Sequence, residues 1–75
     1  MDERLKLHKA LSETEVEYQK KFDAMKNFEL GLLHSSIIVP QTLEEWDNLE
    51  KAERVAYNKR ERARKAYKEY LRRTH

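Results

Sequence analysis

The residues of this chain best suited to chemistry are basic side chains close to its C-terminus. Residues 59–75 contain eight Lys or Arg against two carboxylates, whereas residues 40–58 contain two against five. Lys and Arg bind the phosphates of nucleic acids, and tyrosine rings stack on bases. The segment therefore indicates a candidate surface for nucleic acid, a nucleotide or another anion, consisting of Lys59, Arg60, Arg62, Arg64, Lys65, Tyr67, Lys68 and Arg72.

The same charges also have a purely structural interpretation. Cations at the C-terminal end of a helix interact favourably with the helix dipole. In a folded-back chain they would also lie beside the acidic residues near the N-terminus, which are Asp2, Glu3, Glu13, Glu15 and Glu17. Both interpretations remain open from the sequence.

Catalytic and metal-binding patterns are not found. His8, His34 and His75 are far apart in the sequence and lack the Glu-x-x-His and His-Glu-x-x-His spacings of metal sites. The chain has no cysteine and one glycine, which excludes thiolate chemistry and a glycine-rich phosphate loop. The acidic cluster at Glu44–Glu53 is typical of a solvated helix start. We therefore predict a protein that is not an enzyme and that has no metal or cofactor.

Composition limits the class of protein further. Seventy-five residues suffice for one domain, and charged residues make up 40% of them with nearly balanced signs. The mean hydropathy is −1.06. The longest apolar run, Ile37–Val39, is far shorter than the roughly 20 residues of a membrane span, and the N-terminal residues lack the apolar region of a signal peptide. We expect a cytoplasmic protein without a membrane partner.

Two amphipathic stretches position these residues. In the first, inward positions recur every three or four residues, which is helical periodicity. These positions are Leu7, Leu11, Thr14, Tyr18, Phe22, Met25, Glu29 and Leu32. The second stretch begins with Thr42 and Glu45, the spacing of a capping box. The sequence predicts one helix over about 3–33, a connector at 34–41 and a second helix over about 42–73.

An antiparallel two-helix hairpin follows from two long arms and a short connector, so the predicted fold class is all-α. Folding the arms together pairs residues whose numbers sum to about 75, such as Tyr18 with Ala56 and Leu7 with Tyr67. Large side chains of the first arm then face alanines of the second, while Tyr70 faces Leu5. Favourably ordered i,i+4 ion pairs are expected at Asp47–Lys51, Glu50–Arg54, Glu61–Lys65 and Glu69–Arg73.

A polar gap interrupts this stripe, because Lys59 and Arg60 are expected to point inward, opposite Thr14 and Glu15. Long basic side chains can pack their stems and keep their charges in water. Alternatively, the gap is a buried polar layer that sets the helix register, or an anion pocket.

Apolar residues at the margins of the stripe predict self-association, because a lone hairpin would leave them in water. A homodimeric four-helix bundle would bury them. The predicted interface residues are Phe28, Leu33, Val55, Tyr57 and Ala66.

The hairpin tip is unusually apolar, and we single out Ile37, Ile38, Val39 and Trp46. It either folds back over the bundle end or contacts a partner. The sequence thus favours a non-enzymatic adaptor or inhibitor that binds another macromolecule, expected to be a protein, through the second helix and the tip. The alternative is a protein that binds nucleic acid or a nucleotide through the basic segment.

Overall fold

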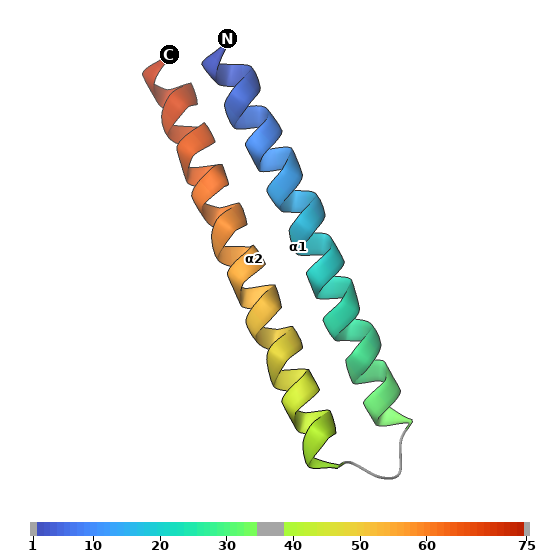
Figure 1. The fold of residues 1–75 in the computed structure, drawn as a ribbon. Coiled ribbons are helices and arrows are strands. Elements are labelled where there is room, and N and C mark those ends of the chain that lie inside the picture. The colour runs from blue at the N-terminus through green and yellow to red at the C-terminus, as the bar shows by residue number, and fades with distance from the viewer. Residues whose placement is uncertain (1, 35–38, 75) are drawn as a thin grey trace.

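A computed structural model shows two long helices, and it describes residues 2–34 and 39–74. Helix α1 covers Glu3–Leu33 and helix α2 covers Pro40–Arg73. They lie side by side in opposite directions, with both chain ends at the same end of a rod (Figure 1). The principal extents are 56 × 19 × 14 Å. The predicted all-α hairpin is therefore confirmed.

Helix α1 begins and ends close to the expected residues. The Asp2 side chain caps its N-terminus, since Oδ1 of Asp2 accepts a hydrogen bond of 3.0 Å from the Arg4 backbone N–H. At the other end the His34 N–H donates to the Gly31 carbonyl over 3.2 Å, and the helix continues through Gly31 to Leu33.

The predicted start of the second helix was wrong. Helix α2 begins at Pro40, two residues before the expected start, and Val39 occupies the N-cap position without a side-chain cap. Proline suits the first helical position because its ring fixes φ at a helical value and its missing N–H would have no partner there. Thr42 is consequently inside the first turn, where its N–H donates to the Val39 carbonyl over 2.9 Å, and no capping box forms.

The contact between the helices follows the predicted stripe and register. All eight predicted inward residues of α1 are partly buried. The rings of Tyr18 and Tyr57 lie 5.8 Å apart and those of His8 and Tyr67 lie 6.1 Å apart, as measured between centroids. Both pairs have numbers that sum to 75, which confirms the register.

The hairpin interior is very thin. Ala56 is the single fully buried residue within the described chain. Leu5, which was expected to pack beneath Tyr70, is 66% exposed, so that prediction was wrong. None of the four expected i,i+4 ion pairs forms; Glu61 contacts Arg60 and Arg64 instead. Neither helix has, within the described residues, an apolar stretch that could cross a membrane.

Ala56 tests how closely the helices must approach each other. Replacing it by leucine adds three carbon atoms where the side chain is only 2% exposed. We expect Ala56→Leu to lower the free energy of unfolding by about 1–3 kcal/mol, because overpacking displaces the facing side chains. Urea unfolding followed by circular dichroism measures the change. The control Ala24→Leu, at an exposed position of α1, should leave stability nearly unchanged; equal losses in both variants would contradict the close contact.

Candidate binding surfaces

The polar gap in the interface is occupied by one arginine. The Arg60 side chain is 15% exposed, and its guanidinium lies 4.2 Å from the centroid of the Tyr18 ring and 5.0 Å from that of Tyr57. Arg60 follows Tyr57 by three residues, so the two share one face of α2. The guanidinium therefore lies between aromatic rings of both helices, where a cation is attracted to the ring faces.

Ion pairs join this guanidinium to carboxylates. Arg60 Nη1 lies 3.7 Å from Glu15 Oε2, and Arg60 Nη2 lies 3.3 Å from Glu61 Oε1. Arg64 Nε donates to Glu15 Oε1 over 3.0 Å, and Arg64 Nη1 lies 3.5 Å from Glu61 Oε1. Glu15 thus bridges two arginines of α2. We call Glu15, Tyr18, Tyr57, Arg60, Glu61 and Arg64 the Arg60 cluster.

Of the two basic residues in the predicted polar layer, only Arg60 lies at the interface. Lys59 is exposed, so the expectation that it points inward was wrong. Lys59 and Arg60 are neighbours, and consecutive helical residues point about 100° apart. The hydroxyl of Thr14, which also belongs to the layer, donates to the carbonyls of Ala10 and Leu11 in its own helix. Nε of Arg60 is buried and has no hydrogen-bond partner among the described residues.

Tyr18 is the residue whose acidity the cluster changes. Partial burial and the negative charge of the adjacent Glu53 carboxylate raise the pKa of Tyr18 above its ordinary 10.0. The Arg60 guanidinium opposes this shift. Sequence spacing does not predict the position of Glu53 beside Tyr18, because Glu53 belongs to an acidic cluster that is typical of a solvated helix start.

The candidate anion-binding residues do not form one surface. Arg60 and Arg64 are held in the Arg60 cluster, and Tyr67 packs against His8. Lys59 and Arg62 are exposed on another side of α2. Lys65, Lys68 and Arg72 do lie together, around a hollow of about 350 Å³ that Glu61, Arg64 and Glu69 also line. Intramolecular pairing thus uses part of the basic charge, including Arg73, whose Nη2 lies 3.4 Å from Glu3 Oε1.

An apolar patch lies at the loop end of the rod. Leu33 is 79% exposed, Leu43 is 49% exposed and Val39 is 40% exposed. Beside them, Glu29, Leu32, Leu33 and Trp46 line a hollow of about 270 Å³. Trp46 Nε1 is buried there with no hydrogen-bond partner in the described part of the chain. We call Leu33, Val39, Leu43 and Trp46 the loop-end patch; the predicted tip residues Ile37 and Ile38 lie outside the described residues.

The predicted oligomer interface falls on two sides of the hairpin. Ala56 faces α1, so its neighbours Val55 and Tyr57 lie on opposite edges of the contact. Leu33, beside Trp46, shares the Tyr57 edge. Helical spacing places Ala66 and Phe28 on the Val55 edge. A single two-fold interface therefore does not include all five predicted residues.

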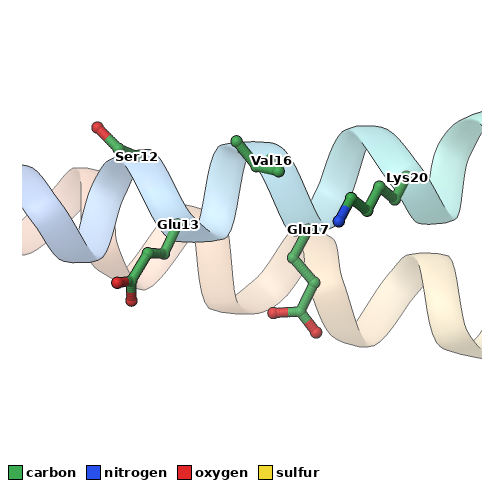
Figure 2. A pocket seen from close by; sticks show the side chains of 5 residues that line it. All are labelled: Ser12, Glu13, Val16, Glu17 and Lys20. Atoms are coloured by element: carbon green, nitrogen blue, oxygen red, sulfur yellow. The ribbon is translucent and has the colours of Figure 1, made fainter.

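The outer face of α1 contains a shallow hollow of about 360 Å³ whose lining does not resemble a binding site. Figure 2 shows Ser12 and Val16 on the side of α1 that is turned away from α2. Glu13, Glu17 and Lys20 complete the lining, so Val16 is its one large apolar residue. This isolated apolar residue is typical of a solvated helix surface.

Neither metal-site geometry nor resemblance to a known protein adds a further candidate site. Residues 2–34 and 39–74 contain no group of three or more His, Cys, Asp or Glu side chains placed to hold a metal ion. Comparison with protein-family models, with curated proteins and with solved structures finds no match to this chain. The candidate sites are thus the Arg60 cluster, the basic hollow and the loop-end patch.

Replacing Arg60 tests whether the cluster stabilises the hairpin. Arg60→Ala removes both the ring contacts and the pairing with Glu15, and it leaves a gap between the helices. We expect a loss of about 1–3 kcal/mol in the free energy of unfolding. The exposed Arg62→Ala should change it by less than about 0.5 kcal/mol. Similar values for the two variants, measured by urea unfolding, would show that the cluster is not structural.

The acidity of Tyr18 provides a second test. Because its folded-state pKa is raised, Tyr18 contributes stability that is complete below its ordinary 10.0 and is lost as the pH rises through the folded-state value. Glu53→Gln should lower the pKa of Tyr18, since the neighbouring negative charge is removed. Carbon NMR of labelled tyrosine measures the titration, and Glu50→Gln is the matched control. An unchanged Tyr18 pKa in Glu53→Gln would contradict the contact with Glu53.

Proposed function

We propose that this chain is a non-enzymatic binding protein that covers its exposed apolar surface with another protein surface, as an adaptor or inhibitor does. One observation is the main support for this proposal. Within the described residues a single side chain is fully buried, whereas eight large apolar side chains are at least 40% exposed. A helix pair this thin is stabilised when a further protein surface excludes water from those side chains.

Self-association is part of this proposal. Two hairpins forming a four-helix bundle would give each helix two packed neighbours instead of one. Alanines at the contact of α2, with Ala56 2% exposed, already permit the close helix packing that a bundle needs. The remaining surface, including the outer face of α2, would then be available to a different protein.

The loop-end patch is the favoured contact for a protein surface, either that of a second copy of this chain or that of a different protein. It combines exposed leucines with a hollow whose apolar walls include the Trp46 ring. Apolar anchors in a central hollow, with polar groups around them, are characteristic of protein interfaces.

A second function, binding of nucleic acid or a nucleotide, is favoured by the basic hollow. Lys65, Lys68 and Arg72 surround it and make no ion pair with any described residue. Two carboxylates, Glu61 and Glu69, line the same hollow and weaken its attraction for phosphate. We therefore place this function second to protein binding.

Site-specific photo-crosslinking in cells separates the two functions. A photoreactive residue at Val39 should form a protein adduct, because Val39 belongs to the loop-end patch. The same residue at Lys20, on the outer face of α1, is the control and should give little adduct. A residue at Lys65 reports on the basic hollow.

The adducts decide between the proposals by their chemistry. A discrete protein adduct from Val39 that resists nuclease treatment and is weak from Lys20 supports protein binding. A nuclease-sensitive adduct from Lys65, lost when salt is raised to about 0.5 M, would make nucleic-acid binding the function instead. No protein adduct from Val39 would contradict the first proposal.

A further inference from the structure

The isolated hairpin exposes more surface than a compact chain of its mass. Its accessible surface is 6200 Å², whereas a folded monomer of 9.1 kDa is expected to expose about 4,900 Å². Its radius of gyration is 17.0 Å, against about 11 Å for a compact domain of this length. The excess of roughly 1,300 Å² exceeds the roughly 800 Å² that each partner buries in a standard interface. A second copy of the chain is large enough to cover it.

The Tyr57 edge is the part of the hairpin surface that a second copy of the chain is best suited to cover. It carries the Arg60 cluster at its centre and most of the loop-end patch toward the loop. Tyr57 itself is 41% exposed, although it lies at the middle of α2. Near the open end, Asp2, Arg4, Leu5, His8 and Tyr67 line a further hollow of about 330 Å³. The edge therefore has a hollow at each end and an exposed aromatic ring at its centre.

Charge along this edge changes sign from one end to the other. On the loop side of Tyr57, helical spacing places three carboxylates and one lysine on this edge, namely Glu29, Glu50, Glu53 and Lys26. On the open side, four cations accompany two carboxylates, and both of these carboxylates are already paired with arginine. The open-side residues are Arg4, Arg60, Arg64, Lys68, Glu15 and Glu61.

We propose that a second copy of this chain packs on the Tyr57 edge in the antiparallel orientation. A two-fold axis near Tyr57 and Tyr18, at the middle of the two helices, places the acidic half of each hairpin against the basic half of the other. The loop-end patch of one copy then covers the hollow beside His8 and Leu5 of the other. A parallel arrangement would oppose like charges at both ends, which is unfavourable.

This inference rests on the proposed function, and it identifies a second copy of the chain as the protein surface that covers the Tyr57 edge. The two edges of the hairpin then have different roles. The Tyr57 edge joins the two copies, while the Val55 edge and the outer face of α2 stay accessible in the dimer. Val55, which is 54% exposed, is then on the surface available to a different protein.

Light scattering after size exclusion tests the dimer and its edge. The wild-type chain at about 0.1 mM should have twice the monomer mass, at both about 0.05 M and about 0.5 M salt. Leu33→Lys, on the Tyr57 edge, should weaken the dimer at least about tenfold, because it places a cation in an apolar contact that faces the basic half of the other copy. Val16→Lys is the matched control, since Val16 is 56% exposed but lies on the outer face of α1 (Figure 2).

Spin-label distances test the orientation. The native chain has no cysteine, so single cysteines can be placed without background. Glu44→Cys and Asn58→Cys are exposed positions on α2, near its start and its middle. In the antiparallel dimer the two labels at residue 44 should be about 40 Å apart along the rod, because 26 residues of helix separate each from its counterpart. Labels at residue 58 should be much closer together.

Each outcome bears on a separate part of the proposal. A dimer with a long distance at residue 44 and a short one at residue 58 supports it. Equal short distances at both residues would overturn the antiparallel orientation. A dimer that Leu33→Lys does not weaken would overturn the choice of edge. A monomeric wild-type chain would overturn the second copy altogether, while a protein adduct from Val39 would still support the proposed function.

Discussion

The structure depends on a single helix–helix contact. Two helices provide one line of packing, and in the described chain only Ala56 is fully removed from water along it. The small side chains of α2 bring the helix axes close enough for large residues of α1 to reach across. Every other described residue keeps some contact with solvent, so polar groups near the contact make a greater share of the specific interactions than they do in a thicker core.

The Arg60 cluster shows how a charged residue is accommodated in such a thin interior. A guanidinium has two apolar faces and a charged rim, so it can stack on the Tyr18 ring while its nitrogens reach Glu15 and Glu61. Apolar residues permit neighbouring registers when the helices slide by one turn. The arginine does not, because a shift would separate it from Glu15 and leave a mostly buried charge unpaired. The cluster thus restricts the hairpin to one alignment.

Residue spacing was sufficient to predict most of the fold. The inward stripe from Leu7 to Leu32 and the pairing of Tyr18 with its counterpart on α2 both follow from helical periodicity, which depends on local geometry alone. The start of α2 was misplaced because two local signals competed there. The conformational restriction of Pro40 prevailed over the hydrogen bonds that Thr42 and Glu45 would have made as a capping box.

The candidate sites were less predictable, because they depend on where long side chains extend. Lys59 and Arg60 have similar chemistry, yet one is exposed and the other is held between aromatic rings. Likewise, the sequence grouped Leu33 with Val55, although the two helices place them on opposite edges. Which side chains are exposed depends on how the two helices are positioned relative to each other. Side chains of both helices determine that position, so the spacing within one helix does not predict it.

The uneven distribution of charge along the rod has a kinetic consequence. Opposite charge at the two ends gives the molecule a permanent electric dipole along its 56 Å length. In the field of another charged macromolecule the rod turns before contact, so a larger fraction of collisions occurs in a productive orientation. Dissolved ions screen this field over about 10 Å at 0.1 M ionic strength. The speed of encounter therefore depends on ionic strength more strongly than the lifetime of the complex, which short-range apolar contacts determine.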